Sequence, residues 1–547
     1  MADENNNLLT VREFEKIYCK SSSSQKDNEK YILLEKDYFD ELKTFIDEHN
    51  SNSDSEEIED KEDDDNLKLY NFISSTYDKN VISVKNYVGL IQLESGFQIE
   101  ILPKVDLSGL PLHRLPKAVS PLSQQADSSP TISGGASSKE NDDFDFQKIN
   151  ESKSKELTEE EKIAETKKVF LEMLEYFLDF TPKKLSTSNI DIQDMSILEI
   201  FIKLFVEEVK NLVKQGLKSS YITIEDNVPY FKGKFLVNQH LKHNLCHKER
   251  FYMAYDEFNL NRPENRLIKS ALSKLRRITT NWENSKEIKM LLNDFEMVDE
   301  SLNYNKDLSK VKIDRNTLSY ASIIQWVKVF LFNKSFTNFS GDGKNKALLF
   351  NMNELFESYV AKKVEEIFTP VGWIVSAQDK QHHLFEKPKM FQLRPDIVIK
   401  KDYKKVILDT KWKVLNNSPR KNYGISPSDM YQMYAYSKKY SAENNNKPSD
   451  VWLLYPKNEG FDLSNLNWKK GNGAKEKINE FVKEIINDRD IYYIEYKEFK
   501  EDNNSNNTTV RVFFVDVAAD LDNTNNSNSI NSLCTIIKEL LEKKNNN

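Results

Sequence analysis

The sequence predicts a multidomain α/β protein with a β-rich N-terminal domain, a helical middle region and a C-terminal domain layered α/β/α. Three observations predict this fold class. The chain has 547 residues, which is too long for a single domain with one hydrophobic core. Apolar residues alternate near the N-terminus and recur every three or four positions in the middle. Towards the C-terminus, strand patterns alternate with helix patterns, which is typical of α/β sandwiches.

Residues 1–105 are expected to form the β-rich N-terminal domain, because apolar residues alternate in VISVKNYVGLIQLESGFQIEILPKV around a turn at Gly96. An acidic insertion at residues 51–66 interrupts this domain with nine acidic residues and one lysine, a net charge of −8. The whole chain has a net charge of −9, so the remainder is nearly neutral. The overall charge therefore neither supports nor excludes DNA as a partner.

Residues 106–160 are rich in Ser, Asp, Pro and Lys and are expected to form a disordered linker or insertion. Residues 161–338 are expected to be mainly helical, as in KKVFLEMLEYFLDF, ILEIFIKLFVEEVKNLVKQGL and NRLIKSALSKLRRI. Between these helices, YITIEDNVPYFKGKFLV is predicted to form a strand pair that turns near Asn227 and Pro229.

Residues 339–547 are expected to form the C-terminal domain. The predicted elements are the helix NELFESYVAKKVEEIF, the strands GWIVSAQ, MFQLRPDIVIK and KKVILDTKWKV, the helix PSDMYQMYAYSKKY, the strands DVWLLYP, DIYYIEY and TVRVFFVDV, and the helix INSLCTIIKELLEKK.

Cysteine usage and hydropathy indicate the compartment. Cys19, Cys246 and Cys534 are odd in number and far apart, which argues for a reducing compartment without a disulfide framework. Each is expected to be a small buried hydrophobic residue. The chain opens with MADENNN and contains no apolar stretch long enough to cross a bilayer. We therefore expect a soluble, cytoplasmic protein without membrane contact.

Two apolar segments, LRPDIVI and VILDTKW, are joined by the polar connection KKDYKK, a pattern that predicts a β-hairpin. If Asp402 and Tyr403 are the central turn residues, the numbers of paired residues add up to 805. Asp396 then lies directly opposite Asp409, with their Cβ atoms about 5 Å apart. The hairpin therefore predicts a pair of neighbouring carboxylates.

Side chains alternate along a strand, so Asp409 and Lys411 share one face, and Leu408, Thr410 and Trp412 share the packing face. Two close carboxylates repel each other unless a cation lies between them. Oxygen ligands favour Mg²⁺ or Mn²⁺ over zinc. The metal would acidify a water, and the Lys411 ammonium would position that water or shield the transition state. The set predicts Mg²⁺-dependent phosphodiester hydrolysis; the alternative is two ordinary strand-end carboxylates and a solvated lysine.

The arrangement P-D, a dozen residues and D-x-K resembles the PD-(D/E)xK nuclease superfamily, which implies a restriction-endonuclease-like C-terminal domain. An ordered set of segments narrows the resemblance to McrC, the nuclease subunits of McrBC modified-cytosine restriction systems. These segments are NYVGLIQLESGFQIEILPKV, YDEFNLNRPENRLIKSAL, ELFESYVAKKV, LRPDIVI, LDTKWK and SDMYQMYAYSKKY. The acidic run and the Ser-rich insertion depart from the usual form of that family.

The resemblance implies specific roles for residues of this chain. Asp396 and Asp409 would be metal ligands assisted by the Thr410 carbonyl, and Lys411 would be the catalytic lysine. Glu357 matches the acidic residue that the superfamily places near the metal, although a solvated glutamate on an exposed helix face is nearly as good an interpretation.

In the helix after the hairpin, Gln432 and Tyr436 match the family's glutamine and tyrosine, and their spacing puts both on one side. Gln432 would bind DNA backbone or orient a ligand, with plain packing as the alternative. Ser426 and Pro427 form an N-cap and first-turn pair that would start this helix.

The resemblance also implies partners. McrC acts with a separate AAA+ GTPase (McrB) that forms rings, recognises modified-cytosine DNA and translocates, and it docks through its N-terminal half. Arg262 and Asn265 lie in a matching segment, although helix capping and packing explain them equally well. The segment Gly341-Asp-Gly-Lys344 lacks the other residues of a phosphate loop, so this chain is expected to bind no nucleotide itself.

The expected function is therefore the double-stranded DNA endonuclease subunit of a GTP-dependent restriction complex in phage defence. Two alternatives stay open: a non-catalytic adaptor that activates an AAA+ NTPase, and a stand-alone repair nuclease. A zinc site is set aside, because the zinc-type side chains of His240, His243, Cys246 and His247 lie too close in sequence to reach one ion easily.

Overall fold

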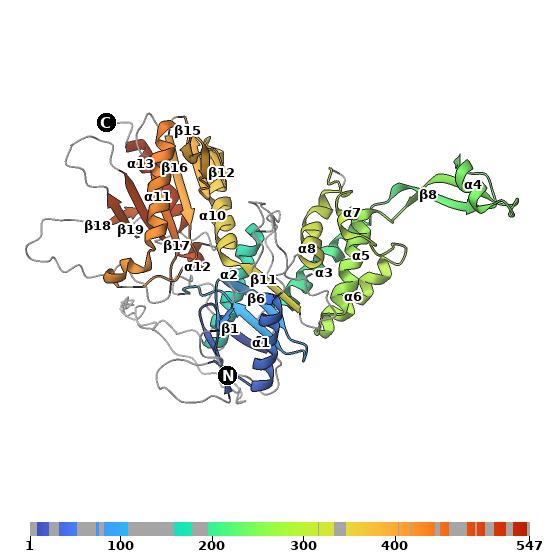
Figure 1. The fold of residues 1–547 in the computed structure, drawn as a ribbon, viewed down its shortest axis with the longest axis horizontal. Helices are drawn as coiled ribbons and strands as arrows, with labels where there is room; N and C mark the ends of the chain where they lie inside the picture. Colours follow the sequence, from blue (N-terminus) through green and yellow to red (C-terminus); the bar gives the residue numbers. More distant parts are fainter. Residues whose placement is uncertain are drawn as a thin grey trace, which may run out of the picture.

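The computed structural model describes residues 8–20, 32–51, 73–75, 81–107, 158–177, 195–315, 317–332, 346–402, 404–416, 418–443, 449–458, 479–486, 489–497, 508–520 and 529–543. Nearly all of the acidic insertion and most of the predicted linker lie outside these residues. In the described part of the chain, strands and helices form a mixed α/β protein with several sheets (Figure 1).

Two small sheets form the N-terminal part. The first has the strand order β1-β7-β6-β11, and the second has the order β3-β2-β5-β4. Their bounds are β1 (Leu8–Arg12), β2 (Lys16–Cys19), β3 (Ile32–Leu34), β4 (Ile73–Ser75), β5 (Val81–Val84), β6 (Tyr87–Gln92), β7 (Gln98–Leu102) and β11 (Lys346–Asn351), with helix α1 (Lys36–Ser51) beside β2. The alternating segment around Gly96 forms the β6–β7 pair, as predicted.

Strand β11 connects distant parts of the chain. It lies in the segment expected to begin the C-terminal domain, yet it pairs antiparallel with β6, so the first sheet is discontinuous in sequence. The two backbones approach closely at Gly89, which has a φ of 139°. A Cβ atom at Gly89 would lie 1.9 Å from the backbone oxygen of Leu348. Only glycine fits this position, because it combines a positive φ with the absence of a side chain.

The middle region is helical, as its periodicity predicts. Its helices are α2 (Glu159–Phe177), α3 (Ile197–Gln215), α5 (Pro263–Arg276), α6 (Trp282–Asp294), α7 (Tyr304–Leu308) and α8 (Ala321–Phe332), with a 3₁₀ turn at Leu318–Tyr320. Helices α3, α5, α6, α7 and α8 pack on one another as a bundle. Helix α2 instead packs against β7 and against α10 (Met352–Phe368).

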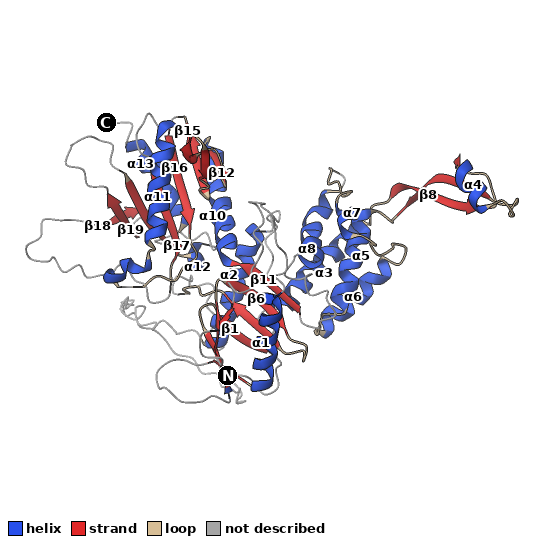
Figure 2. Ribbon diagram, in the orientation of Figure 1, coloured by secondary structure: helices blue, strands red, loops and turns tan. Residues whose placement is uncertain are grey.

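An arm projects from this bundle (Figure 2). It contains β8 (Ser220–Val228), β9 (Lys234–Phe235), α4 (Val237–His243) and β10 (Phe251–Asn259). The predicted strand pair with a turn near Asn227 and Pro229 is wrong, because β8 pairs along its whole length with β10. The local partner β9 is only two residues long, so the nine-residue β10 beyond α4 supplies the longer ladder.

A seven-stranded sheet forms the C-terminal part, with the order β12-β15-β16-β17-β20-β19-β18. Its bounds are β12 (Ile374–Ala377), β15 (Ile397–Lys401), β16 (Lys404–Thr410), β17 (Asp450–Pro456), β18 (Asn479–Ile486), β19 (Arg489–Lys497) and β20 (Thr509–Val515). The strands β16, β17 and β20 run parallel, and the other neighbours are antiparallel.

The segment MFQLRPDIVIK was predicted as one strand, and this prediction is wrong. It divides into β14 (Lys389–Gln392), which pairs with β13 (His383–Glu386), and β15. Pro395 lies in the break, and a proline cannot donate the ladder hydrogen bond of a central strand. Strands β4, β10, β11, β13 and β18 were not predicted.

Helices cover both faces of the seven-stranded sheet. Helices α10 and α13 (Ile530–Lys543) lie on one face, and α11 (Pro427–Lys439) lies on the other. Shorter elements are 3₁₀ turns at Thr369–Val371, Pro419–Gly424 and Tyr440–Glu443 and helix α12 (Val517–Asp520). The core on the α10 side continues into the N-terminal sheet and the helical bundle, whereas the core under α11 is separate.

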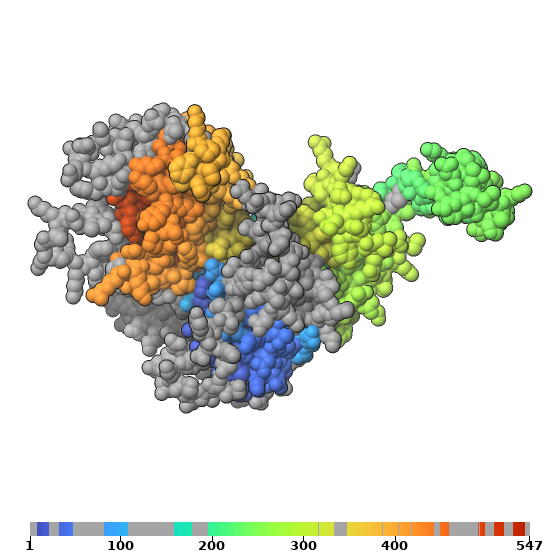
Figure 3. Space-filling view, viewed as in Figure 1, coloured from blue at the N-terminus to red at the C-terminus, as the bar shows by residue number. Residues whose placement is uncertain are grey.

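In the space-filling view (Figure 3), the green surface of the arm extends away from the bundle; the rest of the described molecule is here called the body. None of the helices in the described residues is both long and apolar enough to traverse a bilayer.

Candidate active site

The hairpin β15–β16 has the predicted register. Ile397 pairs with Leu408, and Lys401 pairs with Lys404, so the paired numbers add up to 805. Asp402 has a φ of 53° in the turn, while Tyr403 lies outside the described residues. Asp396 directly precedes β15, and this register brings it to the end of β16 that carries Asp409.

Asp396 and Thr410 are joined by two hydrogen bonds. One oxygen of Asp396, Oδ2, accepts the backbone N–H of Thr410 at 2.7 Å and the Thr410 hydroxyl at 2.8 Å. The next residue, Lys411, donates its backbone N–H to the Leu454 carbonyl at 2.9 Å, which holds the strand end against β17. The start of β15 and the end of β16 are therefore fixed side by side.

Asp409 is fully buried, and its Oδ2 accepts a hydrogen bond from Lys411 Nζ. Burial and the nearby Asp396 charge raise the pKa of Asp409 to about 7. Burial by itself lowers the pKa of Lys411, but the carboxylates of Asp409 and Asp396 outweigh it, so the net shift is upward. Lys411 therefore remains an ammonium group.

Glu357 joins this cluster from helix α10. It is half-buried rather than solvated, and burial followed by the Asp396 charge raises its pKa to about 7. Gln378 donates a side-chain hydrogen bond to it, and the charges of Arg394 and Lys411 favour its ionised form. The charge of Asp396, at the start of β15, therefore acts on two carboxyl groups, Glu357 on α10 and Asp409 near the end of β16.

Helix α11 borders the same cluster, and it begins as predicted, with Ser426 as N-cap and Pro427 in the first turn. Gln432 donates a hydrogen bond of 2.7 Å to the Tyr436 hydroxyl. Tyr436 is buried, and burial followed by the Asp409 charge raises its pKa. Gln432 thus reaches the site through Tyr436, and both residues were expected here from the family resemblance together with their i, i+4 spacing.

Asp429 and Lys413 form a second ion pair beside the site that sequence reasoning missed. The distance between Lys413 Nζ and Asp429 Oδ2 is 2.7 Å, and the Tyr455 hydroxyl donates to the same oxygen at 3.0 Å. Asp429 is buried, and its charge contributes to raising the pKa of Asp409. The sequence signal that could have identified Lys413 is its position two residues after Lys411, because side chains two apart in an extended segment point to the same side.

Glu13 is a further residue that the sequence did not single out. It follows β1, is fully buried, and its Oε2 accepts hydrogen bonds from Trp412 Nε1 at 2.9 Å and from the Lys104 backbone N–H at 3.2 Å. Trp412 also contacts Phe356 edge-to-face, with ring centroids 5.4 Å apart. Trp412 therefore links the N-terminal part to the two elements that carry Lys411 and Glu357, and no local pattern predicts this contact.

The donor atoms suit a hard cation only in part. Among the described residues, no three His, Cys, Asp or Glu side chains are placed to hold a metal ion together. However, Asp409 Oδ1 is buried and has no hydrogen-bond partner among them. An unpartnered buried carboxylate oxygen is costly and suits a cation. Asp396, Asp409 and the Thr410 carbonyl could supply oxygen ligands, with water filling the remaining positions of a Mg²⁺ ion.

The other residues that the sequence singled out have structural roles. His240 contacts Asn244 at 3.0 Å and stacks on Phe251, and His243 stacks on Tyr252. Cys246 is exposed, so the expectation that every cysteine is buried is wrong for this one; Cys19 and Cys534 are buried.

Arg262 and Asn265 lie where the bundle meets the arm. Arg262 pairs with Glu264 at 3.2 Å. Asn265 is buried and donates to the backbone carbonyls of Lys218 at 3.1 Å and Leu260 at 2.8 Å. These contacts fit the packing interpretation of both residues.

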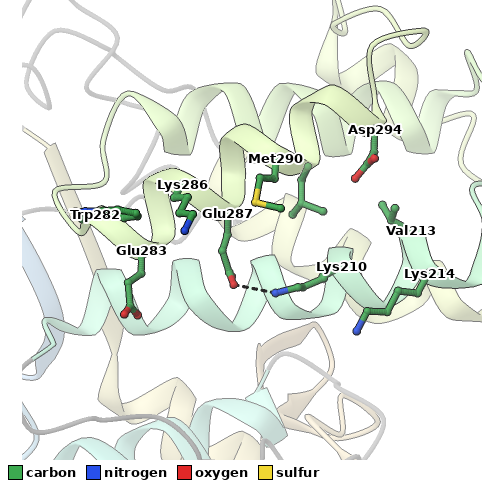
Figure 4. Close-up of a pocket in the computed structure, with 10 residues that line it drawn as sticks. Lys210, Val213, Lys214, Trp282, Glu283, Lys286, Glu287, Met290 and Asp294 are labelled. Carbon is green, nitrogen blue, oxygen red and sulfur yellow. Dashed lines mark hydrogen bonds and ion pairs between the residues drawn. The ribbon is translucent and has the colours of Figure 1, made fainter.

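A groove of about 810 Å³ lies between α3 and α6, far along the chain from the carboxylate cluster (Figure 4). Trp282 and Met290 give it an apolar lining, and Lys210 and Glu287 form an ion pair of 2.8 Å across it. None of the candidate site residues lines this groove.

A solved structure resembles this chain over almost its whole length. A solved half-complex from a tetradecameric assembly of Thermococcus gammatolerans McrB AAA+ hexamers with bound McrC contains a chain that matches 97% of this one and is itself fully covered. The identity is 16% and the TM-score is 0.56, so the two share a fold. A cryo-EM structure of the T. gammatolerans McrBC complex matches 69% of this chain and 90% of that chain, with 14% identity and a TM-score of 0.41.

Comparison of the sequence with protein-family models, unlike the structural similarity, identifies the family of this chain. No curated protein sequence matches the chain. A family model described as McrBC 5-methylcytosine restriction system component matches residues 82–456, which span both the helical middle region and the candidate site. Because this match covers more than half of the sequence, the chain belongs to the family of McrBC 5-methylcytosine restriction system components.

Proposed function

We propose that this protein is a Mg²⁺-dependent DNA endonuclease, the cleaving subunit of a GTP-dependent restriction complex. The observation that carries the proposal is the cluster at the end of β16. Asp409 is buried and pairs with Lys411, the charge of Asp396 acts on it, and its Oδ1 has no hydrogen-bond partner in the part of the chain that the structure describes. The seven-stranded sheet with helices on both faces is the architecture expected for a restriction-endonuclease-like domain.

Each residue has a part in this proposal. Asp396, Asp409 and the Thr410 carbonyl would hold Mg²⁺, which when bound acidifies a water and offsets negative charge on the phosphate. Lys411 keeps its proton, so its ammonium orients the attacking water or stabilises the transition state. Glu357, with a pKa raised to about 7, can accept or release a proton near neutral pH. Gln432 and Tyr436 shape the α11 side of the site.

The test is cleavage of a cytosine-methylated plasmid in the presence of Mg²⁺, GTP and the candidate AAA+ partner. Asp409→Asn and Lys411→Ala are expected to lower the cleavage rate by roughly a hundredfold or more, as loss of one electrostatic group in an active site does. The matched control is Asp402→Asn, an acidic residue in the turn of the same hairpin. Unchanged cutting by Asp409→Asn would overturn the catalytic assignment.

The partner proposed is an AAA+ GTPase ring like the McrB hexamers of the Thermococcus half-complex. Several large apolar side chains on the arm are exposed, namely Tyr221, Tyr230, Phe231, Val237, Leu241, Leu245 and Phe258. Large apolar side chains that are exposed in number on one projecting segment indicate an interaction surface. The arm therefore is the part of the chain best suited to dock on the partner.

Two observations favour the alternative of a non-catalytic adaptor. The described residues hold no three-ligand metal cluster, and Lys411 already occupies one oxygen of Asp409. Calorimetry with Mn²⁺ separates the two functions. A nuclease binds Mn²⁺ and loses it on Asp396→Asn or Asp409→Asn, whereas an adaptor shows no binding that depends on these residues.

A further inference from the structure

The hairpin β13–β14 lies in the chain between β12 and Asp396 of the candidate active site. Its strands pair antiparallel, with His383 opposite Gln392. Asp396 follows β14 by only a few residues. Two hydrogen bonds hold the base of the hairpin, from the Leu393 N–H to the His382 carbonyl and from Gln392 Nε2 to the Lys380 carbonyl, both at 2.8 Å.

Further hydrogen bonds hold the residues just before the hairpin against the carboxylate cluster. The backbone N–H of Gln378, at the start of the segment, donates to the Asp396 carbonyl at 2.8 Å, and its side chain donates to Glu357. On the α11 side, the Tyr440 hydroxyl donates to Asp379 at 2.7 Å. The hairpin therefore holds a fixed position relative to the proposed catalytic residues.

The hairpin exposes large apolar side chains. Phe385, Met390 and Phe391 are 55%, 50% and 65% exposed, and the rings of the two phenylalanines meet edge-to-face with centroids 6.0 Å apart. In Figure 3 the segment belongs to the yellow-orange surface at the upper edge of the body. Paired aromatic rings exposed next to an active site indicate a contact surface rather than scattered surface residues.

The charge around these rings is positive, although the whole chain is acidic. Residues 378–394 contain four basic and two acidic residues, a net charge of +2. Lys380, Lys387, Lys389 and Arg394 are exposed. Arg394 lies close enough to Glu357 for its charge to lower the pKa of that carboxyl. The basic surface therefore begins at the edge of the proposed catalytic centre.

We propose that the β13–β14 hairpin is a DNA-contacting surface that holds the duplex beside Asp396 and Asp409; this inference rests on the proposed nuclease function. Lys387 and Lys389 contact phosphates, and Phe385 and Phe391 pack on sugars and base edges. A polyanion fits this surface better than a second copy of the chain, because two copies would bring like charges together.

The test is binding of a fluorescent DNA duplex to the full chain by anisotropy, over a range of salt concentrations and with Ca²⁺ in place of Mg²⁺. The double variant Lys387→Ala and Lys389→Ala is expected to bind more weakly, with a salt slope shallower by about 2, because each phosphate contact contributes about 0.9. Phe385→Ala with Phe391→Ala is expected to weaken binding roughly tenfold.

The matched control is Lys286→Ala with Lys289→Ala, two exposed lysines on α6. These changes are expected to leave DNA binding unaltered. Thermal unfolding of each variant checks that the exposed hairpin still folds. Sedimentation velocity measures self-association in the same samples.

Unchanged duplex binding by both hairpin variants, or a wild-type chain that binds no duplex, would overturn the inference. Loss of self-association with DNA binding intact would overturn it too, and would assign the surface to contact between copies. None of these measurements requires cutting, so they are independent of the cleavage test with the AAA+ partner. Failure of the hairpin is thus distinguishable from failure of the nuclease proposal.

Discussion

At the scale of single residues, the burial of acidic side chains dominates the electrostatics of this protein. Asp409, Glu357 and Glu13 all have pKa values raised by burial, to about 7, 7 and 8 respectively. The first two lie in the candidate site, where a cation would offset the Asp396 charge that acts on both. Glu13 lies outside it, in the contact between the N-terminal part and Trp412, and its Oε1 has no hydrogen-bond partner among the described residues.

Glu13 makes stability depend on pH. Its folded pKa of about 8 exceeds the ordinary value of 4.5, so its contribution to stability is full below pH 4.5 and is lost as the pH rises towards 8. Glu13→Gln keeps an acceptor for Trp412 without the charge. We expect the variant to unfold at the same temperature as wild type near pH 5, and at least roughly 2 °C higher near pH 9.

The measurement is thermal unfolding of both proteins across this pH range. The difference between them isolates Glu13 from Asp409 and Glu357, which titrate in both. Equal unfolding temperatures at high pH would show that Glu13 does not carry a buried charge. Trp412→Phe, which removes the indole donor, is expected to destabilise the protein at both ends of the range.

At the scale of elements, the pairing of β6 with β11 decides whether the N-terminal sheet is complete. This ladder joins residues more than 250 positions apart, and it depends on the close approach at Gly89. The paired strands in turn place α10, which follows β11 directly and carries Glu357. A substitution at Gly89 that displaces β11 is therefore expected to shift α10 and with it Glu357.

Gly89→Ala is expected to destabilise the protein by about 1–3 kcal/mol, the usual range for an overpacked site, because its Cβ meets the backbone of Leu348. The matched control is Gly96→Ala. Gly96 has a similar positive φ of 86°, but a Cβ atom there meets nothing within 4 Å. Chemical denaturation measures both variants, and a Gly89→Ala variant no less stable than Gly96→Ala would contradict the β6–β11 pairing.

At the scale of the whole molecule, the arm and the C-terminal sheet lie at opposite sides of the helical bundle (Figure 1). The base of the arm is anchored in the bundle, where the Lys218 N–H donates to the Tyr320 hydroxyl at 2.9 Å and Asn265 binds the Lys218 carbonyl. Ser220 and Asn259 face each other at this base. The arm can therefore be removed without opening the bundle.

Replacing residues 221–258 by a two-glycine turn between Ser220 and Asn259 is expected to abolish binding to the proposed AAA+ partner, because the exposed apolar side chains of the arm are lost. Unfolding temperature is expected to stay within about 2 °C of wild type. Mn²⁺ binding at the candidate site is expected to be unaltered. Co-sedimentation with the partner measures the loss, and retained binding would place the docking surface elsewhere.

Features that depend on neighbouring residues could be predicted from the sequence alone. The short connection between β15 and β16 sets their register, so the pairing of these two strands could be predicted from the sequence alone. Ser426 and Pro427 likewise predicted the start of α11, and apolar periodicity predicted the helices of the middle region. Each of these rests on side-chain alternation or on capping, which act over a few residues.

Contacts between distant segments could not be predicted in this way. The fold paired β8 with β10, brought β11 into the N-terminal sheet, and placed Glu13 on Trp412, 399 residues away in the chain. It also buried Asp409, and that burial, more than residue type, sets its pKa. Such contacts depend on which surfaces exclude water together, and the local pattern of a sequence carries no record of them.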